Sequence, residues 1–258
     1  MLRWCLFFPF LLEGLYVGNP ASSSLLQTGL FSVHNYLITV SSGYVYDTTW
    51  DKKLRPDPGS CLEEIEEFQI VSNWSALCCT LLRRFSLYAY LGVSEETMDW
   101  NTHQQGGDKR VGSFETKNHF SYSLGAKMIL LRWFSTLIGM DIQFFSLPSS
   151  KELIEKIEAW YPWNVETSRH YLEIEEWHIA LGAVHSFGPF SAYLGGKYGE
   201  KIVEVHGRAR DKPWELREQN RWGVFTGLSL RMSRGLYVNF EGRWLDEQAF
   251  SFAAITAF

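Results

Sequence analysis

Residues 119–131 read HFSYSLGAKMILL, and this stretch decides the fold. The even-numbered positions from Phe120 to Leu130 are all apolar or aromatic, whereas the odd-numbered positions carry His119, two serines, a glycine and Lys127 before the apolar end. A period of two places alternate side chains on opposite faces of a β-strand. About ten residues with this alternation are typical of a membrane barrel strand, which is apolar toward lipid and polar toward the lumen.

The same alternation recurs along most of the chain. It predicts ten strands, at 36–49, 66–81, 86–95, 118–131, 135–146, 171–186, 190–200, 221–231, 236–245 and 248–258. The connections between them alternate in length, with long polar segments at 50–65, 96–117, 147–170 and 201–220, short ones between them and a tight last turn. Long outer loops that alternate with short periplasmic turns characterise outer-membrane barrels. We therefore predict an all-β protein, a transmembrane antiparallel up-and-down β-barrel of about ten strands, with twelve as the alternative.

Aromatic residues make up 16% of the chain, and they gather at the ends of the predicted strands. Those expected near the long loops are Tyr44, Tyr46, Phe120, Tyr122, Phe144, Trp177, Tyr198, Trp222, Trp244 and Phe250. Those expected near the short turns are Trp133, Phe187, Phe190 and Phe258. Two such girdles are favoured at the two membrane–water interfaces, where amphipathic rings are most stable.

Composition excludes several other classes of protein. The mean hydropathy is −0.14, so a bundle of membrane helices, each with about 20 apolar residues, is excluded. The net charge of −5 gives no electrostatic reason to expect a nucleic-acid partner. His206, Asp211 and Glu215 share one long segment without a recognisable catalytic spacing, and no nucleophile elbow, phosphate loop or metal-ligand spacing is present. We predict no enzyme activity, no cofactor and no metal.

The amino terminus has the features of an export signal. Met1-Leu2-Arg3 is basic, residues 4–12 are apolar apart from Pro9, and Gly14 offers a small residue for cleavage. We expect a signal peptide at 1–14, a periplasmic segment at 15–35 and an outer-membrane barrel at 36–258. A buried amino-terminal strand or helix is the alternative.

Several segments resemble the chlamydial major outer membrane porin family. They are Leu15-Tyr-Val-Gly-Asn-Pro-Ala21, an internal hairpin at 84–92, and the tail, where WGVFTGLSL (222–230) precedes YVNFEGRWLDEQA (237–249) and a last strand that ends at Phe258. The tail is the specific part, and together the segments cover about a third of the chain. The resemblance implies a bacterial outer-membrane location, porin activity, intermolecular disulfides and a terminal Phe258 that is read by the barrel-insertion machinery.

The chain departs from that family in length and in cysteines. It is shorter, and residues 22–60 contain no cysteine, whereas the family has a cluster there. Cys61, in a long segment, is the candidate for an intermolecular disulfide. Cys78 and Cys79 are adjacent and are expected on opposite faces of a strand.

The period of two also assigns residues to the lumen. The predicted pore-lining residues are Lys127, Asp141, Gln143, Tyr193, Lys197, Arg221, Arg231, Asn239, Glu241 and Arg243. Both charge signs occur, and ten strands enclose a narrow interior, so either a salt-bridge plug or a conducting path is consistent with this set. Two functions follow: porin-like passive diffusion of ions or small solutes, or a structural or adhesive barrel with a plugged, non-conducting lumen. The expected partners are outer-membrane lipid, the insertion machinery, and other envelope proteins or further copies of the chain.

The segment 147–170 carries a helix signal. Ser149 and Glu152 form a capping box, and Leu153, Ile157 and Trp160 share one side of the predicted short helix.

Overall fold

The computed structural model describes residues 38–56, 64–82, 84–103, 109–116, 118–150, 156–158, 171–206, 214–233 and 236–257. The predicted signal peptide at 1–14, the segment 15–35, Cys61 and Phe258 lie outside these residues. No helix in the described ranges is long and apolar enough to cross a membrane.

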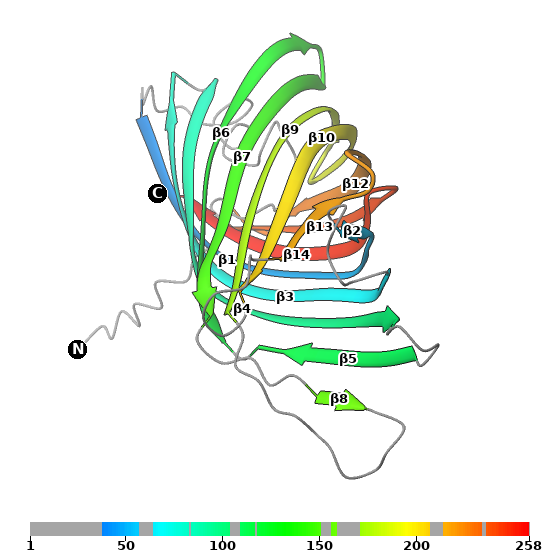
Figure 1. Ribbon diagram of the computed structural model, residues 1–258. Coiled ribbons are helices and arrows are strands. Elements are labelled where there is room, and N and C mark those ends of the chain that lie inside the picture. The colour runs from blue at the N-terminus through cyan, green and yellow to red at the C-terminus, as the bar shows by residue number, and fades with distance from the viewer. Residues whose placement is uncertain are drawn as a thin grey trace, which may run out of the picture.

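The fold is a closed antiparallel β-barrel of ten strands (Figure 1). In order around the barrel they are β1 (Ile38–Lys52), β3 (Glu64–Leu81), β4 (Phe85–His103), β6 (His119–Trp133), β7 (Thr136–Ser150), β9 (Tyr171–Phe187), β10 (Phe190–His206), β12 (Trp222–Arg231), β13 (Leu236–Trp244) and β14 (Glu247–Ala257). Each pairs with the next along the chain, and the β1–β14 pair, in which Ser41 lies opposite Ala257, closes the ring. The predicted fold class and strand count are confirmed.

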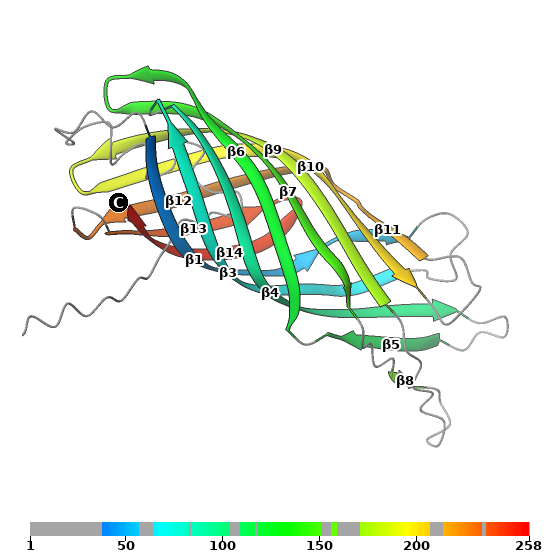
Figure 2. The same ribbon diagram turned by 90° about the vertical axis from the view of Figure 1, so that its left-hand side faces the viewer.

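Four shorter strands extend one end of the barrel, β2 (Leu54–Pro56), β5 (Lys109–Glu115), β8 (Lys156–Glu158) and β11 (Trp214–Glu218). Strand β5 pairs with β4 and β8, whereas β11 joins β10 to β2. In Figure 2 these strands lie at the end of the barrel opposite the end of β14. Much of the sequence that we predicted as loop therefore forms strands that extend the barrel wall at this end, and we name this extension the cuff.

The predicted helix in 147–170 is wrong where the structure describes it. Residues 149 and 150 belong to β7, and Ile157 lies in β8, opposite Gly112 of β5. Glu152, Leu153 and Trp160 fall outside the described residues. Pairing of Lys156–Glu158 with the edge of β5 satisfies backbone groups of these three residues, which outweighs the local capping signal there.

The short turns lie at the other end of the barrel, and their backbones explain their tightness. Leu82, Phe134 and Gly188 have φ values of 52°, 51° and 67°, the left-handed conformation that reverses a chain within two residues. The turn predicted at Arg132-Trp133 lies one to two residues later, because β6 continues through Trp133.

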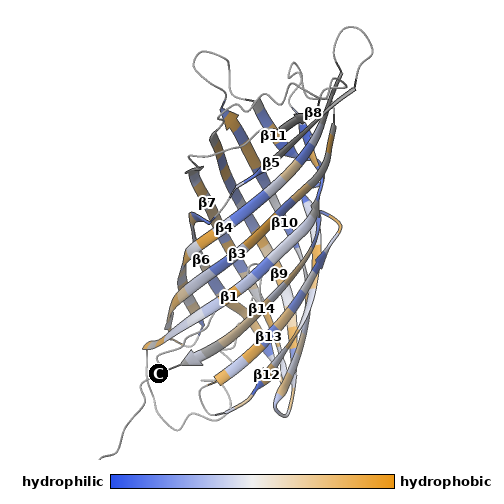
Figure 3. Cartoon of the chain, turned by 90° about the horizontal axis from the view of Figure 1, so that it is seen from below, coloured by the Kyte–Doolittle hydropathy of each residue, from blue (hydrophilic) through white to orange (hydrophobic). Residues whose placement is uncertain are grey.

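The outer surface of the barrel carries an apolar band. Hydropathy alternates along the strands (Figure 3), and the exposed members include Ile179, Leu181 and Leu194. On β9 the band runs from Trp177 to Phe187, and these ten residue steps correspond to about 25 Å along the axis at about 3.3 Å per residue and a tilt of about 40°. That height matches the hydrophobic band of an outer-membrane barrel.

Aromatic side chains border this band on both sides. On the cuff side Trp177, Tyr198 and Trp222 form a continuous row across β9, β10 and β12, with ring centroids 6.0 and 4.9 Å apart. On the turn side Phe187 stacks with Phe190. The outer surface is therefore that of a barrel that spans a bilayer.

Candidate functional site

The interior of the barrel is the candidate functional site, and its composition changes with height. On β1 the bulge between Thr49 and Asp51 shifts the inward parity, so that Lys52 also faces inward. Along β9 and β10 one parity faces inward throughout, and the polarity of that face inverts above the cuff-side aromatic row. On β10, for example, Lys197 faces inward beside the apolar band, whereas Val203 and Val205 face inward farther along, with Glu204 now outward. The cuff is thus apolar inside and polar outside, as in a water-soluble barrel.

The first interior layer, the apolar cap, fills the cuff. It consists of buried side chains from seven strands, and they are Leu54, Phe68, Met98, Trp100, Leu147, Leu172, Ile174, Val203, Val205 and Leu216. Leu147, Leu172, Ile174, Val203 and Leu216 are 0% exposed. These side chains are therefore packed against one another and away from solvent.

The second layer, the ionic layer, lies next to the cap and is built from buried charges. Its cations are Lys52, Lys197, Lys201 and Arg243, and its anions are Asp47, Glu176, Glu218, Glu241, Asp246 and Glu247. Four positive and six negative groups give this layer a formal charge of −2. Six strands and the β13–β14 turn contribute, so the layer ties one wall of the barrel together.

Each cation of the ionic layer contacts more than one strand or turn of the wall. Lys52 Nζ lies 3.5, 3.0 and 3.2 Å from carboxylate oxygens of Glu176, Glu218 and Glu247. Its position at the end of β1 thus connects that strand to β9, β11 and β14. Because a buried charge without a partner is costly, these groups hold one another in place.

Arg243 is the most completely buried of these cations, at 0% exposed. Its guanidinium lies 2.8 Å from Asp47 Oδ1, 2.8 Å from Glu247 Oε1 and 3.7 Å from Glu241 Oε1. Lys197 Nζ contacts the tip of the same hairpin, 2.6 Å from Asp246 and 2.7 Å from Glu247. The β13–β14 hairpin is therefore fixed to β1 and β10 from the inside.

The third layer, nearer the short turns, mixes aromatic rings with hydrogen-bonded polar groups. The Tyr88 hydroxyl donates to Asp141 at 2.8 Å, and Lys127 Nζ lies 3.7 Å from the same carboxylate. The Trp74 indole nitrogen donates to Ser121 at 2.7 Å, and its ring stacks on Tyr90 with 6.0 Å between centroids. Trp74, Tyr88 and Tyr90 are therefore buried aromatic side chains of the lumen.

A second group in this layer involves strands β10, β12 and β13. The Tyr193 hydroxyl donates to Glu241 at 3.0 Å and accepts from the Asn239 amide at 2.8 Å. Ser229 donates to the Asn239 carbonyl oxygen. These bonds satisfy polar groups that the lumen removes from water.

Eight of the ten residues that the sequence assigned to the lumen lie buried inside the barrel. They are Lys127, Asp141, Gln143, Tyr193, Lys197, Asn239, Glu241 and Arg243. Their role as the lining of a conducting pore remains a prediction.

The other two residues differ. Arg231 is half-buried at the end of β12, opposite Tyr237. Arg221 does not face the lumen: it precedes β12, is exposed, and pairs with Glu200 on the outer surface of β10. The strict period of two fails for Arg221 because the residue lies before the regular strand begins.

Sequence reasoning missed seven of the ten residues of the ionic layer, all but Lys197, Glu241 and Arg243. Lys52, Lys201 and Glu218 fall in segments predicted as loops, and Glu247 in a predicted tight turn. One sequence signal could have identified Lys201. The alternation that places Lys197 inward continues through residue 201 to Val203 and Val205, and in this part of the strand the inward face is the apolar one.

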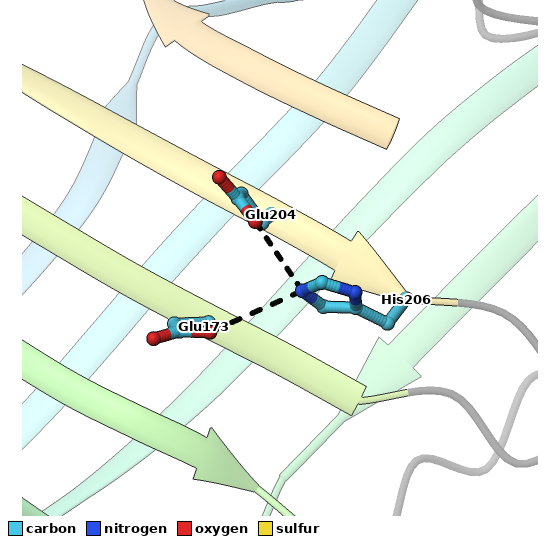
Figure 4. Close-up of side chains that lie close together, drawn as sticks. All are labelled: Glu173, Glu204 and His206. Atoms are coloured by element: carbon cyan, nitrogen blue, oxygen red, sulfur yellow. Dashed lines mark ion pairs between the residues drawn. The ribbon is translucent and has the colours of Figure 1, made fainter. Parts of the chain in front are cut away.

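The outer face of the cuff carries a smaller cluster of titratable groups (Figure 4). His206 Nε2 lies 3.3 Å from Glu204 and 3.9 Å from Glu173, and Glu173 is the cross-strand partner of Glu204. One ligand atom from each residue falls within 4.8 Å of the others, so these side chains could hold a divalent cation. Each is about 40% exposed, and His206 itself offers a counter-charge when protonated.

Of the residues considered for catalysis, His206 contacts Glu204 and Glu173. Glu215 lies opposite Glu204 on β11 and pairs with Arg217 at 2.5 Å. Asp211 is outside the described residues.

The two central cysteines lie on opposite faces of β3. Cys78 is buried, and Cys79 is partly exposed on the outer surface.

No family model and no curated protein matches the chain. Among solved structures, the chain is similar to an outer membrane channel from Pseudomonas putida F1, with 8% identity and a TM-score of 0.44 over 87% of this chain and 97% of that one. It is also similar to the outer membrane protease OmpT from Escherichia coli, with 10% identity and a TM-score of 0.41 over 90% and 97% of the two chains. A third such structure is the transport unit of the Escherichia coli autotransporter AIDA-I, with 11% identity and a TM-score of 0.38 over 92% and 96%.

Proposed function

We propose that this chain is an integral outer-membrane barrel with a closed lumen, which acts as a structural or adhesive platform for its outer loops rather than as an open porin. The observation that carries this proposal is that three layers of buried side chains, the apolar cap, the ionic layer and the aromatic and polar layer, follow one another along the lumen. Residues that line an aqueous pore contact water, whereas Arg243, Lys201 and Lys52 are at most 2% exposed.

The apolar cap gives a second reason. A porin needs a polar path from one mouth to the other, because ions do not cross dry apolar regions. Here the inward face of the cuff is apolar on several strands, and an ion that entered from outside would meet this layer first. A ten-stranded ring also encloses little space, since about eight strands are already filled by side chains and wide pores need about 16.

The cuff supports a role at the outer surface. It carries the predicted long segments on a rigid sheet, well beyond the aromatic row, and its outer face presents Glu173, Glu175, Glu204 and Glu215. A filled, rigid support is what a protein needs to hold loops in place for contact with other molecules.

Conductance of purified, refolded protein in planar bilayers tests the closed lumen. We expect no discrete conductance steps under conditions in which a known porin, reconstituted in parallel, conducts. Heat-dependent gel mobility and circular dichroism must first show that the barrel has formed. Reproducible single-channel steps from the folded wild-type protein would contradict the proposal and favour passive diffusion, the function that the porin resemblance implies.

Accessibility on intact cells tests the orientation. Tags inserted within 104–108 or 207–213 should be reached by external antibody, while a tag at Arg84 should be reached only after the outer membrane is broken. Equal labelling of all three insertions would contradict the orientation.

A further inference from the structure

One seam of the outer surface breaks the apolar pattern of the membrane band. Strands β1 and β3 present Ser42, Tyr44, Asn73 and Ser75 on the outward face, and we name these four residues the polar seam. At the corresponding height the opposite wall presents Leu181 and Leu194.

The seam lies within the hydrocarbon part of the band. Ser42 is four residues beyond Ile38 at the start of β1, and Ser75 is six before Leu81 at the end of β3. With about 3.3 Å per residue and a tilt of about 40°, these positions lie about 10 and 15 Å from the turn-side edge of a band about 25 Å high. Lipid chains at this depth offer no hydrogen-bond partners.

The polar groups of the seam are only partly satisfied within the barrel. The Tyr44 hydroxyl donates to Asn73 Oδ1. In the described part of the chain, the Asn73 amide nitrogen and the hydroxyls of Ser42 and Ser75 have no side-chain hydrogen-bond partner. Because polar groups exposed to hydrocarbon without a partner cost free energy, the seam needs an external partner.

Other outward polar groups in the band show the contrast. The Thr226 hydroxyl donates to the Tyr193 carbonyl oxygen at 2.8 Å. Thr136 and His185 bond to each other at 2.9 Å near the turn-side edge. These groups are satisfied within one barrel, unlike the Asn73 amide nitrogen and the two serine hydroxyls of the seam.

We propose that the polar seam is the contact surface between two copies of this chain in the membrane. All copies insert with the same orientation, so a twofold axis between them runs along the membrane normal and brings residues of equal height together. Asn73 offers both a donor and an acceptor, and each serine hydroxyl offers both, so the seam is complementary to itself. It carries no charge that would repel a second copy, and Ala254, the β14 partner of Tyr44, is small enough to permit close approach.

Disulfide trapping in membranes tests this proposal directly. In a background without the four native cysteines, Ser75→Cys should form a disulfide-linked dimer after mild oxidation. Leu194→Cys is the matched control, because it lies at a similar depth on the opposite wall and should stay monomeric. Heat-dependent gel mobility shows that each variant is folded.

The expected product is a covalent species of twice the chain's mass from Ser75→Cys alone. Dimer from both variants equally, or from neither, would overturn the proposal. A cross-linked product of another mass would overturn it as well, because the seam would then bind a different envelope protein.

A second measurement does not depend on cysteine chemistry. Asn73→Leu should raise the apparent dissociation constant of the dimer, measured by energy transfer between labelled copies in vesicles, by about tenfold, the factor expected when a hydrogen bond at the interface is lost. Thr226→Val removes an outward polar group that is already satisfied within the barrel, and it should leave association unchanged. If the two substitutions have the same effect, the seam is not the interface. Self-association is independent of conductance, so its failure would leave the closed lumen untouched.

Discussion

Replacing Arg243 with alanine should destabilise the barrel more than any other single loss of charge in the ionic layer. The guanidinium is fully buried and has three carboxylate partners, of which Asp47 and Glu247 lie at 2.8 Å. Its removal leaves Asp47 buried without its counter-charge and leaves Glu247 with Lys52 and Lys197 alone, and breaking a buried pair in this way costs about 3–5 kcal/mol. With a urea dependence of about 3 kcal/mol per molar, the unfolding midpoint should fall by about 1 to 1.7 M.

Urea unfolding in lipid vesicles, followed by tryptophan fluorescence, measures this change. Arg221→Ala is the matched control, because Arg221 also pairs with a glutamate but lies exposed on the outer surface, and its removal should not move the midpoint. Adding Asp47→Asn to an Arg243→Met variant should recover part of the loss, since the carboxylate that lost its counter-charge is then neutral. A midpoint for Arg243→Ala equal to that of Arg221→Ala would refute the view that the ionic layer holds the wall together.

Two further substitutions test the faces of the wall. Val238→Glu places a charge on the lipid face of β13, which costs up to about 2–4 kcal/mol near the bilayer midplane, and it should reduce the folded fraction measured by heat-dependent gel mobility. Ile202→Glu is the control, because Ile202 lies beyond the aromatic row, and this substitution should be tolerated. Equal folded fractions of the two variants would contradict the assigned membrane band. Gly125→Ala would place a Cβ 2.1 Å from the Tyr88 ring, which Asp141 holds in place, and should lower stability by about 1–3 kcal/mol in the same urea assay. Gly196→Ala is its control, because the nearest atom to the new Cβ is 3.6 Å away, and an equal loss from both would refute the packing argument.

The sequence was sufficient to predict the ring because lipid imposes a simple rule on each strand. Where one face contacts hydrocarbon, the alternation is strong, as from Phe120 to Leu130, and the strand boundaries there fall within a few residues of those observed. The rule stops at the aromatic row. In the cuff the outer face contacts water and the inner face contacts an apolar core, so the apolar residues are on the inward positions instead of the outward ones. A search for strands with an apolar outer face therefore assigns Val203 and Val205 to a loop.

The ionic layer could be predicted only in part for a related reason. Parity indicates that Lys197 and Glu241 point inward, but not which partners they meet. Lys52 reaches Glu176 and Glu218 because β1 continues into β2 and β2 pairs with β11, an arrangement with no local sequence signal. Non-local pairing, rather than any property of the individual residues, places these charges together.

The pairing of β2 with β11 also means that the barrel closes twice. The β1–β14 pair closes the membrane ring, whereas residues near 55 meet residues near 217 above the short β13–β14 hairpin. Pairs so distant in the chain form slowly, because the entropy of closing a long loop must be overcome before their contacts stabilise them. The apolar cap cannot be complete until the upper closure forms. Folding should therefore pass through a species whose membrane ring is already resistant to protease while its cuff is still open to digestion.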